Sequence, residues 1–233
     1  MRSVPKAVLA AATLLGCGAA AQADLIYSNT FENAGVPVPE WSSNATFTSA
    51  APFTRFLGRY GGIDSVTLTL NIPTDDTGGT GGGGTGGGTG GGGGGTQRLY
   101  TLLFDLYPID TWDGHEPNFG PDAFQVYING SLHFNHTIAN QHGLQSFRPP
   151  DLGPAPMAFG SANDSIYRDI AISFTLDPAA TELKFKFRSQ LTQTLADESW
   201  GIDNVRVNYT VVPSAGTCVL LALGGLVAAR RKR

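Results

Sequence analysis

The densest run of polar side chains lies near the middle of the chain. It reads Asp110-Thr111-Trp112-Asp113-Gly114-His115-Glu116 and continues to Asp122. An aromatic face can stack on the apolar face of a sugar ring, and carboxylates accept hydrogen bonds from its hydroxyl groups. Because Trp112 stands in a polar segment, we expect it at a binding surface together with Asp110 and Asp113. In the alternative interpretation, the aspartates only shape a turn.

The sequence carries no motif of a known catalytic site. It has neither a Gly-x-Ser-x-Gly elbow nor a His-Glu-x-x-His helix. His133 and His136 point to opposite faces of a strand, so they do not form a transition-metal site with His142. We therefore predict no catalytic residues and a protein that is not an enzyme. A carboxylate pair for glycoside hydrolysis stays open, because the distance between carboxylates is not readable from a sequence.

Alternating polar and apolar residues predict that strands position this polar run. The pattern is clearest in Glu182-Leu183-Lys184-Phe185-Lys186-Phe187-Arg188, which alternates over its whole length. Asn129-Gly130 between two alternating runs predicts a hairpin. Trp200 belongs to the final strand region and is expected in the core. The predicted strands are 25–31, 55–60, 66–70, 99–107, 124–128, 132–134, 167–176, 182–188 and 202–209.

Two segments interrupt these strands. Residues 78–96 are only Gly and Thr, so they bury no apolar area that would offset the entropy of ordering them. They are predicted to be a disordered loop insertion that joins two strands. Residues 141–164 carry four prolines, Pro149, Pro150, Pro154 and Pro156, and predict a long irregular surface connection. Many short strands without a helical stripe favour an all-β fold, an antiparallel sandwich or jelly roll, over residues 24–211.

Composition excludes some classes of function and narrows others. The chain has 233 residues and a formal net charge of -4 at pH 7, and no basic stripe follows a strand or loop. Binding to nucleic acid is therefore not expected. Cys17 and Cys218 both lie in terminal apolar segments, so the body contains no cysteine and no disulfide. Its stability must come from a core, with a bound ion as a further source.

Residues 1–23 have the organisation of a secretory signal peptide. Arg2 and Lys6 precede an apolar stretch, and Ala21-Gln22-Ala23 provides small residues at the cleavage site. We expect a helical signal segment, cleavage after Ala23 and export of the mature chain. The alternative is a lipobox at residues 14–17, in which Cys17 would become the acylated first residue.

Residues 212–233 form a second targeting segment. Residues 218–229 are apolar but shorter than the roughly 20 residues of a full membrane span, and Arg230-Arg231-Lys232-Arg233 follows. With Val212-Pro213 and Gly216-Thr217, this order resembles the PEP-CTERM sorting signal, although Ser214-Ala215 stands where that signal has Glu-Pro. The resemblance implies an exosortase as partner, transient tethering to the inner membrane by a short transmembrane helix, and bacteria that make extracellular polysaccharide. The alternative is an ordinary membrane anchor.

Several short motifs in the body resemble lectin-like and MAM-like sandwich domains. They are Phe31-Glu32, residues 110–114, residues 122–130 and residues 197–205. The resemblance implies that the first and last strands lie side by side and that a structural calcium ion sits between Glu32 and Asp203, joined by Asp105 or Asp113. In the alternative interpretation, Asp203 only caps a turn or binds neighbouring backbone.

These observations combine into one main hypothesis and two alternatives. The main hypothesis is an exported, non-enzymatic lectin-like protein, displayed at the cell surface or outer membrane or released outside the cell, with extracellular glycan as its partner. The first alternative is a structural surface or matrix protein without a specific ligand. The second, weaker one is a glycan-cleaving enzyme.

Overall fold

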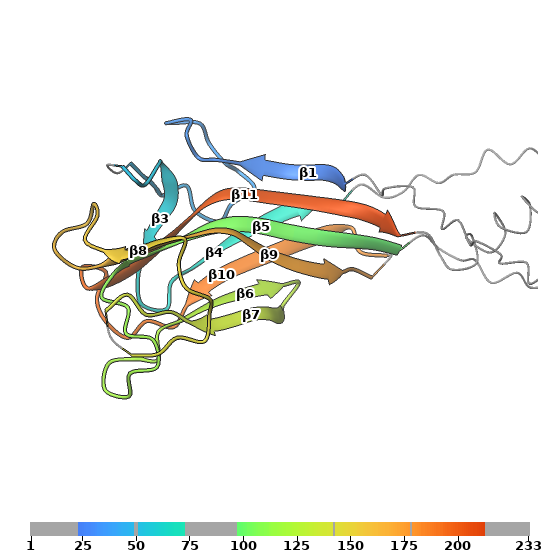
Figure 1. Ribbon diagram of the computed structural model, residues 1–233. Helices are drawn as coiled ribbons and strands as arrows, with labels where there is room; N and C mark the ends of the chain where they lie inside the picture. Colours follow the sequence, from blue (N-terminus) through green and yellow to red (C-terminus); the bar gives the residue numbers. More distant parts are fainter. Residues whose placement is uncertain (1–22, 49–50, 73–96, 142, 178, 213–233) are drawn as a thin grey trace, which may run out of the picture.

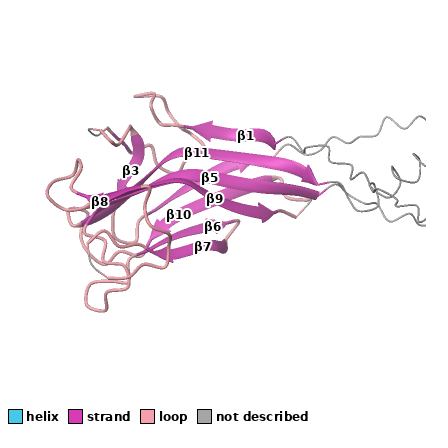
Figure 2. Cartoon of the chain, in the orientation of Figure 1, coloured by secondary structure: helices cyan, strands magenta, loops and turns pink. Residues whose placement is uncertain are grey.

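The computed structural model describes residues 23–48, 51–72, 97–141, 143–177 and 179–212. All the regular secondary structure in this part of the chain is β-strand, as Figure 2 shows. The strands are β1 (Ala23–Asn29), β2 (Thr46–Phe47), β3 (Phe56–Tyr60), β4 (Ser65–Asn71), β5 (Gln97–Asp110), β6 (Ala123–Ile128), β7 (Ser131–Thr137), β8 (Leu152–Ala155), β9 (Asp164–Thr175), β10 (Glu182–Ser189) and β11 (Glu198–Val212).

The strands form two antiparallel sheets that pack face to face. The larger sheet has the order β2-β3-β11-β5-β9-β8, and β1 pairs with the second half of β11. The smaller sheet has the order β4-β10-β6-β7. In Figure 1 the strands β11, β5 and β9 lie over β10, β6 and β7. The described chain is therefore a β-sandwich, as the alternation of residues predicts.

The core lies between the two sheets and is rich in aromatic side chains. The rings of Phe104 on β5 and Phe187 on β10 pack edge to face, with their centroids 5.3 Å apart. The rings of Phe124 on β6 and Trp200 on β11 do the same, with a centroid distance of 5.1 Å. Such contacts add to the free energy gained by burying apolar area. Trp200 is fully buried, which confirms its predicted place in the core.

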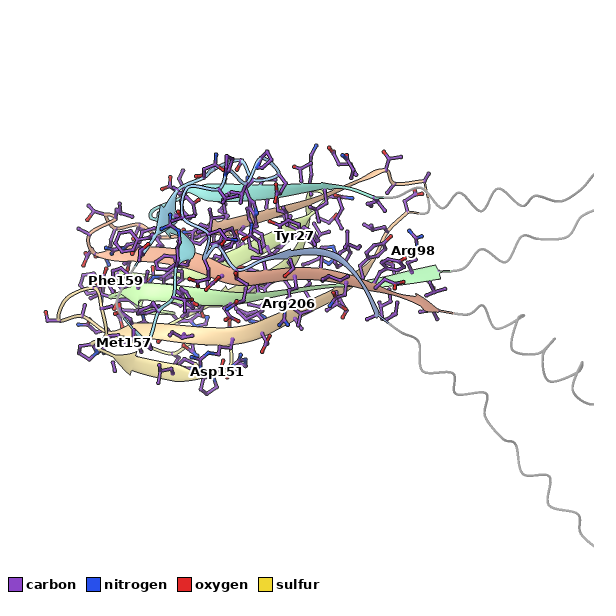
Figure 3. The ribbon with its side chains drawn as sticks, turned by 90° about the horizontal axis from the view of Figure 1, so that it is seen from above. Tyr27, Arg98, Asp151, Met157, Phe159 and Arg206 are labelled. Atoms are coloured by element: carbon purple, nitrogen blue, oxygen red, sulfur yellow. The ribbon has the colours of Figure 1, made fainter. Side chains whose placement is uncertain are left out.

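The second half of β5 is buried on both faces, because a small second core covers the outer face of the larger sheet. That core contains Phe53, Phe56, Tyr107, Ile109 and Ile166, with Met157, Ala158 and Phe159 packed against it. Figure 3 shows Met157 and Phe159 near one end of the sandwich and Arg98 at the other. Polar residues of β5 near this core are therefore removed from water.

All the predicted strands are present, and two are additional. The turn at Asn129 and Gly130 has φ values of 46° and 85°, which confirms the hairpin. The expectation that the first and last strands lie side by side is also confirmed, because β1 pairs with β11. The prediction missed β2 and also β8, a short edge strand inside the connection 141–164. Such short strands are made by tertiary contacts and leave little pattern in a sequence.

The targeting segments and the Gly/Thr tract fall outside the described residues. Of the predicted sorting residues, Val212 is the last residue of β11. Pro213, Gly216, Thr217, Arg230 and Arg231 lie outside the described part, as do residues 1–22 and the tract 78–96. Within the described part, no helix has the length and apolarity to span a bilayer.

Candidate functional site

One end of the sandwich gathers the polar run and the starts of several strands. In an antiparallel fold β5 ends where β6 and β11 begin, and these points lie at the left in Figure 1. The loop 111–122 connects β5 to β6 at this end. It is fixed by a backbone bridge between Asp113 and Ala139 and by the Asn140 N–H, which donates to the Trp112 carbonyl at 2.7 Å.

Trp112 is a core residue in this structure. Its side chain is fully buried, and its indole N–H donates to the Ser199 carbonyl at 2.8 Å. The backbone of the loop 111–122 forms hydrogen bonds with neighbouring loops, whereas the indole ring of Trp112 packs inward against the main core. Trp112 therefore presents no exposed face on which a sugar could stack. The prediction that it is exposed, which rested on the polarity of its sequence neighbours, is wrong.

Asp110 and Asp113 are also buried, at 5% relative exposure each. The Asp110 carboxylate forms an ion pair with Arg59, and its backbone N–H donates to Asp164 Oδ1 at 3.0 Å. Burial raises the pKa of Asp110 to about 6, although the positive charge of Arg59 lowers it in part. Direct contact of these two aspartates with a sugar stays a prediction, and it would require the loop to open.

Asp113 instead joins a group of three buried carboxylates with Asp122 and Glu198. One carboxylate oxygen from each lies within 4.8 Å of the others. Asp122 immediately precedes β6, and Glu198 is the first residue of β11. Both are completely buried. Among the residues that the structure describes, this is the one group of three or more acidic, His or Cys side chains close enough to share an ion. We call it the acidic cluster.

The acidic cluster is partly satisfied by hydrogen bonds. The Asp113 backbone N–H donates to Asp122 Oδ2. The Gln193 side-chain amide donates to Glu198 Oε1 at 3.0 Å and to Asp113 Oδ2 at 3.4 Å. As carboxylates, Asp122 Oδ1 and Glu198 Oε2 are buried and accept no hydrogen bond. With a proton on one of them, the two carboxyl groups form a hydrogen bond with each other. Within the described chain, neither Asp122 nor Glu198 pairs with a Lys or Arg.

Burial raises the pKa of both of these carboxyl groups. For Glu198 the pKa rises to about 8, because desolvation is reinforced by the negative charges of Asp122 and Asp113. For Asp122 the pKa rises to about 6, with desolvation partly opposed by its hydrogen bond from the Asp113 backbone. Two arrangements suit such a pair: a proton shared between the carboxyl groups, or a cation that all three carboxylates bind.

The predicted calcium residues Glu32, Asp203 and Asp105 form no comparable group within the described residues. Asp105 and Asp203 face each other on β5 and β11, and each of their four carboxylate oxygens accepts at least one hydrogen bond. The donors, at 2.6–3.0 Å, are the backbone N–H groups of Asn204 and Asp169, the side-chain amide of Asn204 and the hydroxyls of Thr54 and Tyr107. These carboxylates need no cation to be satisfied, and calcium at Glu32 and Asp203 stays a prediction.

A cavity of about 330 Å³ lies beside the end of β1. Its lining has a polar and an apolar part, and we call it the asparagine pocket. The polar lining residues are Asn29, Asn33, Asn44, Thr46 and Arg55; the others are Phe31, Gly35, Val36, Pro37 and Val38. Among the described lining residues Arg55 is the only charged one, and its terminal nitrogens donate to the hydroxyls of Thr46 and Thr48. The pocket thus combines hydrogen-bonding amides with an apolar wall.

The acidic cluster left partial signals in the sequence, whereas the asparagine pocket left none. Asp122 directly precedes β6 and Glu198 is the first residue of β11, and antiparallel strands that start at the same end bring such residues together. The pocket comes from three separate segments, 29–38, 44–46 and residue 55. Its assembly depends on loop conformations that no periodic pattern encodes.

The comparisons with known proteins give little further information. No protein-family model and no curated protein matches this chain. Among solved structures, its fold is similar to part of dimeric latent PorU from Porphyromonas gingivalis, with a TM-score of 0.42 and 13% sequence identity. The match covers 84% of this chain and 14% of the PorU chain, so this chain spans a small part of PorU's length. A similarity of this size carries no argument about function.

Proposed function

We propose that this chain is an exported, non-enzymatic, lectin-like jelly roll that binds extracellular polysaccharide through the asparagine pocket. The observation that supports this proposal is the lining of the pocket. Three side-chain amides and one guanidinium stand beside an apolar wall, and none of the described lining residues carries a carboxylate. Amides donate to and accept from hydroxyl groups, while the apolar wall suits the C–H face of a sugar ring.

Two of the three amides are available to a ligand. Asn29 already binds its own surroundings, since it accepts from the Phe31 N–H at 2.7 Å and donates to the Tyr27 hydroxyl at 3.2 Å. The side chains of Asn33 and Asn44 are exposed and make no hydrogen bond within the described chain. These two residues are therefore the ones that we expect to contact the sugar.

The proposed location follows from the terminal segments. Export by a signal peptide, sorting by an exosortase and temporary retention in the inner membrane would deliver the folded body to the cell surface or to the surrounding matrix. Extracellular polysaccharide would then be the most abundant partner at that location. This part of the proposal is supported by the sequence resemblance alone.

Binding of the full chain to an array of bacterial polysaccharides tests the proposal. We expect binding by the wild type and a loss of about tenfold or more in affinity for Asn33→Ala/Asn44→Ala, since two hydrogen bonds of about 1 kcal/mol each are removed. Asn135→Ala is the matched control, because Asn135 is an exposed amide on β7 outside the pocket. Absence of binding by the wild type, or equal binding by the double variant, would contradict the proposal and favour a structural protein without a ligand.

A further inference from the structure

Among the residues that the structure describes, the acidic cluster holds the two carboxylate oxygens that are buried without a hydrogen-bond donor. Asp122 Oδ1 and Glu198 Oε2 are oxygens of completely buried side chains, and as carboxylates neither accepts a hydrogen bond, so only a shared proton or a cation can satisfy both. A carboxylate removed from water without a partner costs several kcal/mol, so native proteins pair such groups or use them to bind metal ions. Two such oxygens in one group of three carboxylates indicate that the site holds either a proton or a cation.

The donor set defines the class of such a cation. All three side chains offer carboxylate oxygens, and no His or Cys belongs to the group. Hard divalent cations prefer this donor set, whereas zinc and copper prefer nitrogen or sulfur. Oxygens on opposite sides of Ca²⁺ lie about 5 Å apart, and those around Mg²⁺ lie about 4 Å apart. Oxygens within 4.8 Å of one another can surround either ion. The complete burial of Asp122 and Glu198 favours calcium, because Mg²⁺ usually keeps several of its water ligands.

We propose that Asp113, Asp122 and Glu198 bind one calcium ion, which ties the end of β5 to the starts of β6 and β11. This site differs from the calcium site that the sequence resemblance implies, and it is independent of the asparagine pocket. Backbone carbonyls and water complete the six to eight oxygen ligands that calcium needs. The ion holds the loop 111–122 against the first residue of β11, and these two segments lie far apart in sequence.

The alternative arrangement is a proton shared between Glu198 and Asp122. A protonated Glu198 would donate to Asp122 and satisfy both oxygens without a metal. The two arrangements differ in a measurable way, because only the first makes the stability of the folded chain depend on calcium.

Titration of the full chain with calcium, after removal of divalent ions by a chelating resin, tests the proposal. Isothermal calorimetry should show binding at this site, and a calcium concentration 100 times Kd should raise Tm by about 5 °C or more. Glu198→Gln and Asp122→Asn should each lose about tenfold or more in calcium affinity. Glu116→Gln is the control, because it removes the same charge from the same loop without touching the cluster.

The variants also separate the possible outcomes. If calcium neither binds nor raises Tm, the proposal is wrong and the shared proton remains. If calcium binds equally well to Glu198→Gln but not to Glu32→Gln, the ion lies at the site implied by the sequence resemblance, and the proposal is again wrong. Should Asp122→Asn fail to fold, Glu198→Gln decides the question alone, since its amide has nearly the shape of the carboxylate.

Discussion

Two groups of buried carboxylates involve β5 and β11, and their oxygens are satisfied in different ways. Asp105 and Asp203 pair in the middle of these strands, and all four of their oxygens accept hydrogen bonds. In the acidic cluster at the strand ends, Asp122 and Glu198 each keep one oxygen without a donor. Both groups are removed from water to a similar degree. The difference therefore lies in the donors and not in the burial.

Irregular pairing of the strands explains where the donors of the first group come from. The register between β11 and β5 shifts between Asp203 and Arg206, and that between β5 and β9 shifts between Phe104 and Leu106. Next to these shifts, Asn204 and Asp169 adopt positive φ values of 50° and 49°. Their backbone N–H groups leave the strand ladder and donate to Asp203 and Asp105. A bulge thus supplies donors inside a sheet, whereas the strand ends of the acidic cluster have too few.

The largest effect is expected from removing the best satisfied carboxylate. Asp203→Ala leaves the buried Tyr107 hydroxyl and the exposed Thr54 hydroxyl without their shared acceptor. We expect a loss of about 3 kcal/mol in the free energy of unfolding, equal with calcium and with chelator. Urea denaturation of the full chain measures it. Glu182→Ala, which breaks an exposed pair with Lys184, should cost much less. A loss confined to calcium buffer would instead place an ion at Asp203.

A smaller effect is expected from the pH dependence of the same residue. Burial raises the pKa of Asp203 from 3.8 to about 6, although its three hydrogen bonds lower it in part. The folded chain then binds the proton more tightly than the unfolded chain does. The stability from this group is complete below pH 3.8 and is lost as the pH rises through 6.

The measurement is the free energy of unfolding between pH 4 and pH 7 in the presence of chelator. Asp203 should contribute a decrease of roughly 2 kcal/mol over this range, and Asp203→Asn, which does not ionise, should lack that decrease. Equal slopes for the wild type and the variant would show that Asp203 is charged throughout. In that case its donors would outweigh its burial.

The sequence predicted the sandwich well because alternation and turn residues report directly on strands. The run 182–188 and the Asn129-Gly130 turn formed as predicted, since each is specified by its own residues. Trp112 was misplaced, because the exposure of a loop residue depends on what folds over it and not on its neighbours in sequence. The same reason explains the asparagine pocket, which depends on the placement of three segments.

The acidic cluster was accessible to prediction only in part. Asp113 belongs to the polar run that the sequence singles out, Asp122 directly precedes β6, and Glu198 is the first residue of β11. To predict that these three residues lie together, one must know the order and direction of the strands, because these determine that β6 and β11 start at the same end of the sandwich. The donors of Asp105 and Asp203 were beyond prediction, because they arise from register shifts that depend on packing between neighbouring strands.

The smallest effect tests the comparison most directly, because the two groups should respond with opposite signs. In chelator at pH 8, Glu198→Gln should raise the free energy of unfolding by about 1 kcal/mol, since a neutral amide is cheaper to bury and its N–H can donate to Asp122 Oδ1. Asp203→Asn should lower it, since an amide N–H would face the donating hydroxyls of Thr54 and Tyr107. Urea denaturation with Glu116→Gln as control measures both changes. If Glu198→Gln also lowered stability in chelator, the acidic cluster would already be satisfied without an added ion, and the two groups would not differ in the way that their hydrogen bonds indicate.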